Sequence, residues 1–552
     1  MKTKNLSANK LSEEFQSGFL AVCVMAICLL PTVNSFSQGT WTWAKQSHGV
    51  GNCNGSAADA FGNVYVTGSF DTNWSPTMTF GSTILTGTVS GAAYNFFIAK
   101  YDVSGNALWA NGVNYAGASC SGWGVAPDAS GNVYAAGTYG SGSNQPITFG
   151  STTLPYAGNS DLFLVKYDVS GNVLWARGAG GTGGDVAYCA VADVSGNIYL
   201  AGLSTSPSIT FGNNITLTTT GSGYFLAKYD ASGNVLWAKN TSVYPFDMAA
   251  DASGNVYIAG RGVAVSPGAS FDGWLVKYDA SGNLLWTSTS AQNWKAGFAS
   301  VVVDPSGSAV YVTGTVHTIP SISTVSFGSI TVPTYGFWDG FFVKYSASSG
   351  SAICALPIAD LSAPGSANLE QSDVTVDPSG NVYVAGMAAV NQQVDFGPST
   401  SIYVSGSYPM YIVVLDPNCN VICSDYLTEG AGGQLSTVYT SSDPLGNVYV
   451  AGVISANKTF NVGTTTLSSA VENDIWVGKY VKCGGSGCTA TAVISSDPSS
   501  TVCVGQNVFI SASGGITYSW NTGATTANIV AAPSVTTTYS VTLTDAAGCT
   551  GI

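Results

Sequence analysis

One ten-residue motif recurs seven times along this chain and constrains its fold more than any other feature of the sequence. The motif has the form Asp-x-x-Gly-Asn-Val-Tyr-x-x-Gly, as in DAFGNVYVTG, and successive copies start 53 to 73 residues apart. The copies begin at Asp59, Asp128, Asp193, Asp251, Asp304, Asp377 and Asp443, the fifth being one residue longer. Repetition at this period predicts an array of similar units, each of which buries its apolar face against its neighbours.

A second motif follows each copy of the first. It reads FFIAKYDVSGNALWA at 96–110, and it recurs at 163–176, 225–238 and 274–287, in decayed form at 341–354 and 411–423, and as IWVGKYVKC at 475–483. In both motifs the aspartate can accept hydrogen bonds from turn amides, and glycine supplies the positive φ of a tight turn. The flanking runs are β-branched and aromatic, as strands prefer. Each motif therefore predicts a β-hairpin, and each repeat predicts four strands.

Seven units of four strands predict an all-β fold, a seven-bladed β-propeller. The segments between the two hairpins vary in length and often contain a TFGS-like sequence, such as TFGSTIL at 79–85. We expect these segments to be loops. The segment is largely missing between Arg261 and Phe271, so the fourth blade is expected to be short.

The seventh copy of the second motif stops before its last strand, and the stretch TWTWAKQ at 40–46 has the pattern that is missing. Trp43 aligns with Trp109 and its equivalents, and Trp41 takes the position two residues earlier, on the same face of the strand. The sequence therefore predicts that an N-terminal strand completes the seventh blade and closes the ring.

The two motifs, recurring in order, resemble the SBBP family of bacterial β-propeller repeats over roughly residues 39–482. The resemblance implies a propeller fold and an exported or surface-located bacterial protein. It implies no particular activity.

The two ends of the chain differ from the repeats. Residues 1–37 have a basic start and a twelve-residue apolar run at 19–30, which indicates a signal peptide. The propeller is then expected over 38–482 and a Gly/Cys linker over 483–488. Residues 489–552 resemble the small Ig-like or PKD-like modules of secreted bacterial proteins, with Trp520 as the expected core tryptophan of a sandwich and Cys503 and Cys549 as a candidate disulfide.

Composition excludes several classes of function. The net charge is −14, which disfavours binding to nucleic acid or to an anionic membrane surface. Only His48 and His317 could serve as imidazole ligands, and the chain has no CxxC-type zinc pattern. We therefore expect no metal and no cofactor, and no membrane insertion once the signal peptide is removed.

The charged residues point to structure more than to catalysis. Most aspartates fall at fixed positions in the two motifs, and no GxSxG sequence accompanies either histidine. Nine aspartates lie outside the motifs, and a catalytic carboxylate pair among them is left open. Recurring lysines such as Lys100 and Lys166 are expected to pack their stems between blades, with the ammonium at the edge.

We expect a non-enzymatic, monomeric binding or scaffold protein, secreted or held at the cell surface, that recognises a glycan or a protein through propeller loops. Tryptophans outside the repeat pattern are the candidate ligand-binding residues, and these are Trp74, Trp123, Trp294 and Trp338. Two alternatives stay open: a glycan-active hydrolase or lyase using the propeller funnel, and a structural adhesin or spacer without a specific ligand.

Overall fold

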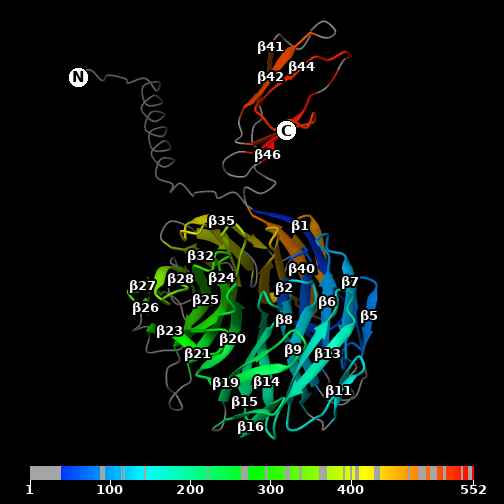
Figure 1. Ribbon diagram of the computed structural model, residues 1–552, viewed down its shortest axis with the longest axis vertical. Helices are drawn as coiled ribbons and strands as arrows, with labels where there is room; N and C mark the ends of the chain where they lie inside the picture. Colours follow the sequence, from blue (N-terminus) through cyan, green and yellow to red (C-terminus); the bar gives the residue numbers. More distant parts are fainter. Residues whose placement is uncertain are drawn as a thin grey trace, which may run out of the picture. The chain divides into compact units, whose positions relative to one another are not determined.

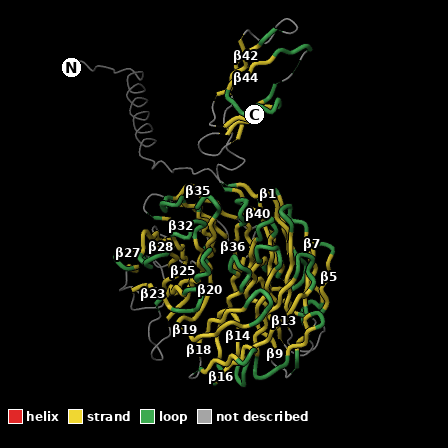
Figure 2. The backbone as a smooth tube through the Cα atoms, in the orientation of Figure 1, coloured by secondary structure: helices red, strands yellow, loops and turns green. Residues whose placement is uncertain are grey.

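The computed structural model describes residues 39–87, 94–113, 115, 119–141, 145–219, 223–262, 272–291, 296–317, 324–334, 338–359, 370–388, 392–397, 401–404, 409–427, 435–469, 473–482, 493–497, 506–513, 517–535, 537, 539–544 and 550–551. Every regular element in these ranges is a β-strand, as Figure 2 shows. The same residues contain no helix that is long and apolar enough to cross a membrane. The expected signal peptide at 1–37, the linker at 483–488, and residues Trp294, Cys503 and Cys549 lie outside the described residues.

Twenty-eight of the strands form seven antiparallel units of four strands, which we call blades 1 to 7 in chain order; two of these units are extended to six-stranded sheets by an added hairpin. The first strands of the blades are β2 (Gly51–Ala58), β8 (Ser119–Pro127), β14 (Asp185–Ala192), β20 (Val243–Ala250), β24 (Ala296–Val303), β30 (Glu370–Val376) and β36 (Leu435–Ser442). The second strands are β3 (Val64–Asp71), β9 (Val133–Ser141), β15 (Ile198–Ser204), β21 (Val256–Gly262), β25 (Ala309–His317), β31 (Val382–Met387) and β37 (Val448–Ile454). The third strands are β6 (Tyr94–Tyr101), β12 (Asp161–Tyr167), β18 (Gly223–Tyr229), β22 (Gly273–Tyr278), β28 (Trp338–Ser346), β34 (Met410–Leu415) and β40 (Asp474–Val481). The fourth strands are β7 (Ala107–Gly112), β13 (Val173–Ala179), β19 (Val235–Thr241), β23 (Leu284–Ala291), β29 (Ala352–Ala359), β35 (Val421–Leu427) and β1 (Thr40–Gln46).

The blades are arranged as a closed ring. Each first strand contacts the first strand of the next blade, and β36 of blade 7 contacts β2 of blade 1. The first strands therefore surround the centre, and the later strands of each blade lie progressively further out (Figure 1). This is a seven-bladed β-propeller, the all-β fold that the repeats predicted.

The outermost strand of blade 7 comes from the other end of the domain. Strand β1 pairs antiparallel with β40, with Trp43 opposite Lys479, just as Trp109 is opposite Lys100 in blade 1. The register shifts between Trp41 and Trp43, which is a β-bulge. Trp41 consequently belongs to the core between blades 6 and 7, whereas Trp43 packs against the core between blades 7 and 1. The expectation that both indoles share one face was wrong, because the bulge turns them to opposite faces.

The motif aspartates organise the tight turns as the sequence predicted. In the first turn, Oδ1 of Asp59 accepts hydrogen bonds from the backbone N–H groups of Phe61 and Asn63, both at 2.9 Å. Its Oδ2 accepts a bond from the side-chain amide of Asn63 at 2.7 Å. Gly62 has a φ of 82°, which a residue with a Cβ rarely adopts.

Four of the recurring lysines, Lys100, Lys166, Lys228 and Lys277, do not place their ammonium groups at a solvated edge. Lys100 is only 4 % exposed, and its Nζ lies 3.7 Å from Oδ2 of Asp59; Lys166 is equivalent, 2.9 Å from Asp128. The turn aspartate therefore supplies the counter-ion that a buried ammonium requires. In blade 6 the lysine position is occupied by Val414, and Lys482 approaches the turn aspartate of that blade to 3.6 Å instead.

The TFGS-like segments are hairpins and not loops. Within the described residues, every blade except blade 4 has an extra two-stranded hairpin after its second strand. The six hairpins are β4 (Thr77–Phe80) with β5 (Thr83–Thr86), β10 (Ile147–Phe149) with β11 (Thr152–Leu154), β16 (Ser208–Gly212) with β17 (Ile215–Thr218), β26 (Thr324–Phe327) with β27 (Ile330–Pro333), β32 (Gln392–Phe396) with β33 (Ser401–Val404), and β38 (Lys458–Val462) with β39 (Thr465–Ser469). Strands β26 and β32 also pair with the outer strand of the preceding blade, so these two hairpins tie neighbouring blades together.

A tryptophan in the outer strand connects most blades to the next. Trp109 packs on Gly171 in the second turn of the following blade, where an added Cβ would come within 2.9 Å of the indole, and its Nε1 donates to the Val169 carbonyl at 3.1 Å. In blade 5 the tryptophan position holds Cys354, and the glycine position of the next turn holds Cys419; the two form a disulfide. A covalent bond thus replaces the tryptophan–glycine contact. Cys423, at the tryptophan position of blade 6, is also disulfide-bonded.

The described strands after the propeller form two three-stranded sheets. One sheet contains β41 (Val493–Asp497), β42 (Val508–Ser513) and β44 (Asn528–Ala531), and the other contains β43 (Thr517–Trp520), β45 (Val541–Thr544) and β46 (Thr550–Gly551). Trp520 is 3 % exposed within a small apolar cluster, and its Nε1 donates to the Thr526 carbonyl at 2.8 Å.

Candidate ligand-binding channel

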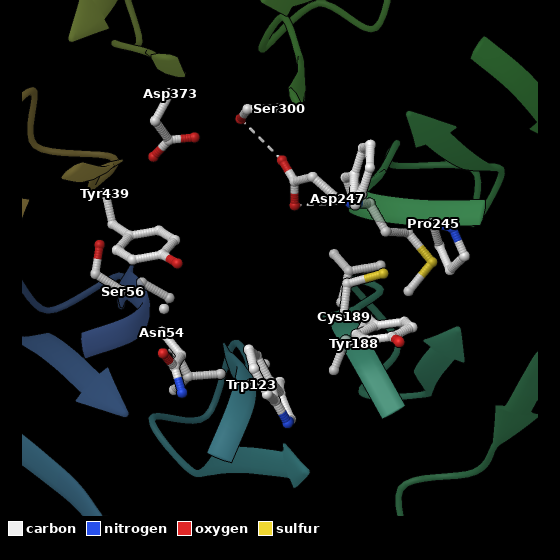
Figure 3. Close-up of a pocket in the computed structure, with 18 of the residues that line it drawn as sticks. Asn54, Ser56, Trp123, Tyr188, Cys189, Pro245, Asp247, Ser300, Asp373 and Tyr439 are labelled. Carbon is white, nitrogen blue, oxygen red and sulfur yellow. Dashed lines mark hydrogen bonds between the residues drawn. The ribbon is translucent and has the colours of Figure 1, made fainter. Parts of the chain in front are cut away.

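A cavity of about 1080 Å³ lies at the centre of the propeller. The first strands of all seven blades contribute to its wall, so we call it the channel (Figure 3). Cavities of this size accommodate small organic ligands, and rigid strands hold the side chains that line them in place.

One position in each repeat faces this channel. Counted four residues back from the turn aspartate, it holds Gly55, Gly124, Cys189, Asp247, Ser300, Asp373 and Tyr439, all of which line the cavity. Each first strand also has a register shift beside this position. β-Bulges redirect side chains next to functional sites, and here they lie beside a position that holds five different residue types in the seven repeats.

Aromatic side chains from blades 2, 3 and 4 cover one side of the channel. This aromatic wall consists of Trp123, Tyr188, Tyr244 and Phe246. The ring centroids of Trp123 and Tyr188 are 6.2 Å apart, and Tyr188 stacks on Tyr244 at 5.2 Å. The hydroxyl of Tyr244 donates to that of Tyr188 at 2.9 Å. Trp123 and Phe246 remain 37 % and 42 % exposed, so part of their ring surface is free to contact a ligand.

Two carboxyl groups, which we call the carboxyl pair, lie on the channel wall with Ser300 drawn between them (Figure 3). Asp247 accepts hydrogen bonds from the Ser300 hydroxyl at 2.9 Å and from the Val301 N–H at 2.8 Å. Asp373 accepts bonds from both the N–H and the hydroxyl of Thr440. The two aspartates come from β20 and β30, on blades separated by one other blade, so only the ring brings them together.

The electrostatics of the pair follow from its surroundings. Burial raises the pKa of Asp247 to about 7, and the neighbouring Asp373 carboxylate adds to the rise. Burial also raises the pKa of Asp373. Among the described residues that line the channel there is no lysine, arginine or histidine to offset these charges.

This arrangement predicts a pH dependence of stability. Asp247 ionises near pH 3.9 in an unfolded chain but near 7 in the folded protein, so between these values the folded state binds more protons. The stabilisation of the folded state by protonated Asp247 is therefore fully present below about pH 4 and is lost as the pH rises through 7. We expect the fall in unfolding free energy between pH 5 and pH 8 to be smaller in Asp247→Asn by about 1–3 kcal/mol.

Denaturant melts of both proteins at several pH values test this expectation. Asp425→Asn is a matched control, because burial raises the pKa of that carboxyl to about 6 and it does not line the channel. In Asp425→Asn the fall in unfolding free energy should become smaller only up to about pH 6, and the fall between pH 6 and pH 7 should remain. An identical pH profile in wild type and Asp247→Asn would show that Asp247 ionises normally.

The structure separates the tryptophans that the sequence grouped as candidates. Trp123 lines the channel, whereas Trp74 is 74 % exposed in the segment after β3 and does not line it. Trp338 begins β28 and packs edge-on against His317, with ring centroids 4.6 Å apart, also away from the channel. These three residues do not form one ligand surface.

Sequence reasoning did not find the rest of the site. Asp247 and Asp373 belong to the nine aspartates outside the motifs, but Asp71, Asp185, Asp395 and Asp425 of that group do not line the channel. Nothing singled out Tyr188, Phe246 or Tyr439. Alignment of the repeats on their turn aspartates would have placed the channel residues in a common register. Within the described residues, no three His, Cys, Asp or Glu side chains gather as a metal ion would require.

Comparison with known proteins gives few relatives in sequence. No family model matches the chain. An uncharacterized WD repeat-containing protein of Acanthamoeba polyphaga mimivirus is 29 % identical over 175 residues, and the match spans 29 % of this chain and 12 % of that relative. The chain therefore corresponds to only a small part of the relative's length.

Several solved structures are similar at a low level. A protein of unknown function from Dyadobacter fermentans has a TM-score of 0.36 and 11 % identity, with 65 % of this chain and 94 % of that one covered. The quinohemoprotein alcohol dehydrogenase of Comamonas testosteroni has a TM-score of 0.34 and 11 % identity, covering 81 % and 78 %. BamB of Moraxella catarrhalis has a TM-score of 0.29 and 12 % identity, covering 70 % and 88 %.

The seven sheets, the ring of first strands and the WD-repeat relative together define the chain as a β-propeller repeat protein. A propeller with variable residues around a central channel is consistent with a binding or scaffold role.

Proposed function

We propose that this protein is a non-enzymatic binding protein that recognises a glycan in the propeller channel. The observation that carries the proposal is the aromatic wall, whose Trp123 and Phe246 rings stay exposed toward a cavity that also offers carboxyl and hydroxyl groups. Aromatic rings present a flat apolar surface to the C–H face of a sugar, and polar groups opposite bind its hydroxyls. The proposed recognition surface is therefore the channel and not the propeller loops. All the residues that line the channel belong to one copy of the chain.

Replacing Trp123 by alanine tests the proposal. A glycan array probed with the purified chain should give hits, and Trp123→Ala should weaken the best of them about five- to thirtyfold, which corresponds to 1–2 kcal/mol. Trp74→Ala is the matched control, since it removes an exposed indole away from the channel. An array without any hit would favour a spacer or adhesin without a specific ligand. Equal loss in both variants would contradict the channel as the binding site.

A second candidate is a glycan-active hydrolase that uses the carboxyl pair. Asp247, with a pKa raised to about 7, could donate a proton at neutral pH while a second carboxylate acts as base or nucleophile. Release of shorter products from array hits, abolished in both Asp247→Asn and Asp373→Asn, would replace the binding proposal with this one.

We further propose an exported, surface-located protein of the SBBP type, with a cleaved signal peptide at 1–37 and an Ig-like module at 489–552. The disulfide between Cys354 and Cys419 supports export, because such bonds persist in oxidising compartments. The two small sheets around Trp520 support a sandwich. The pairing of β1 with β40 supports closure of the ring by the N-terminal strand.

A further inference from the structure

The carboxyl pair consists of two acidic groups that face one cavity, and the described residues give neither of them a positive partner. Its hydrogen bonds come from neutral donors, namely backbone N–H groups and the hydroxyls of Ser300 and Thr440. Two partly buried carboxyls that repel each other cost stability unless they are protonated or meet a cation. By contrast, four buried turn aspartates of the propeller, Asp59, Asp128, Asp193 and Asp251, are each paired with a lysine.

No group that faces the pair supplies a compensating positive charge. The titratable side chains around it are Cys189 and Tyr439, and burial raises the pKa of both, so neither carries a charge. One cation, Arg261, lies beside the aromatic wall, with its guanidinium 4.6 Å from the centroid of Tyr244. Arg261 does not line the channel. A ligand in the channel therefore meets two acidic groups and no basic one.

A third feature is an unused hydrogen-bonding group. Ser441 is 7 % exposed and lines the channel, and its hydroxyl oxygen has no hydrogen-bond partner. A buried hydroxyl without a partner costs about 1–3 kcal/mol, which a ligand donor would recover. Ser441 lies two residues from Tyr439 in β36, beside the acidic part of the channel. An ammonium group has three donors and no acceptor, which suits carboxylates and a free hydroxyl oxygen together.

We propose that the channel recognises an oligomer of an amino sugar, with sugar rings on the aromatic wall and an ammonium group at the carboxyl pair of Asp247 and Asp373. The aromatic wall contributes to the same preference, because aromatic faces attract cations. A divalent metal ion fits less well, because among the described residues no third His, Cys, Asp or Glu joins the pair as a ligand. This inference rests on the proposed function and narrows it to one class of glycan.

The test compares two oligosaccharides of equal length: a β-1,4-linked tetramer of glucosamine and its fully N-acetylated form, which lacks the ammonium groups. Calorimetry at pH 6.5 and low salt should show at least tenfold tighter binding of the glucosamine tetramer. Asp247→Asn and Asp373→Asn should each remove that preference, whereas Asp425→Asn should keep it. Thermal melts of the three variants confirm that they are folded.

Each other outcome overturns the inference. Equal binding of the two tetramers, or tighter binding of the acetylated one, would leave a glycan-binding channel without a cation preference, so the proposed function would stand. Failure of both tetramers while other array glycans bind would have the same meaning. Calcium binding that is lost in Asp247→Asn but kept in Trp123→Ala would identify the pair as a metal site. A preference that survives in both channel variants would place the ammonium elsewhere.

Discussion

Replacing Trp41 and Trp43 by alanine is expected to cost the propeller about 4–7 kcal/mol of unfolding free energy, because it removes one indole buried between blades 6 and 7 and another that joins blade 7 to blade 1. Trp41 is 8 % exposed and packs against Trp476 and Tyr480 of blade 7, with ring centroids 6.0 and 5.1 Å away. Truncation of a buried tryptophan usually costs 3–5 kcal/mol. The larger part of the effect should therefore come from Trp41.

Trp43 connects blade 7 to blade 1. Its Nε1 donates to the Val103 carbonyl of blade 1 at 2.9 Å, and its indole packs on Gly105, where an added Cβ would come within 2.7 Å. The hydroxyl of Tyr449 makes a parallel connection to the Gly62 carbonyl at 2.7 Å. Loss of Trp43 should leave that second connection intact and cost about 1–3 kcal/mol.

Thermal and denaturant unfolding of the single and double variants measure these effects. The double variant should melt about 5–15 °C below the wild type. Trp74→Ala, which removes an exposed indole, should leave the melting temperature within about 1–2 °C. A double variant that melts with the wild type would show that β1 does not hold the ring.

The contrast between Trp43 and Trp41 shows how far the repeat could be used for prediction. The position of Trp43 follows from its alignment with Trp109, because equivalent residues of a repeat occupy equivalent register positions. The side on which Trp41 packs does not follow, since one bulged residue reverses the face. Local motifs therefore predict pairing better than they predict burial.

The same limit explains why the sequence misplaced the lysine ammonium groups and did not reveal most of the channel residues. The pattern located Lys166 in the third strand, but its ion pair with Asp128 depends on the fold of the whole blade. Asp247 and Asp373 are 126 positions apart in the sequence and face one channel only because the ring closes. The first strands share no motif, and functional positions are the ones expected to break a repeat. Trp123 stood out as an irregular tryptophan, while its neighbours Tyr188 and Phe246 had no such signal.

Loss of the disulfide between Cys354 and Cys419 is expected to be the second large effect. The two residues are 65 apart in sequence, and the chain-entropy estimate for a loop of this size is about 4 kcal/mol. Cys354→Ala with Cys419→Ala should therefore destabilise the propeller by about 3–4 kcal/mol under oxidising conditions. The disulfide replaces the indole contact at position 419, but the backbone there keeps a positive φ of 69°, which glycine adopts more readily than a residue with a Cβ.

The repeat itself offers the matched control for the disulfide. Cys354→Trp with Cys419→Gly restores the pair that joins the preceding blades, such as Trp286 of blade 4 with Gly350 of blade 5. Because packing and one hydrogen bond then replace the covalent link, this variant should recover part of the stability that the alanine pair loses. Chemical denaturation of the three proteins, with the disulfide checked by non-reducing peptide mapping, distinguishes the cases. If the alanine pair were as stable as the wild type, the contact between blades 5 and 6 would not depend on the covalent bond.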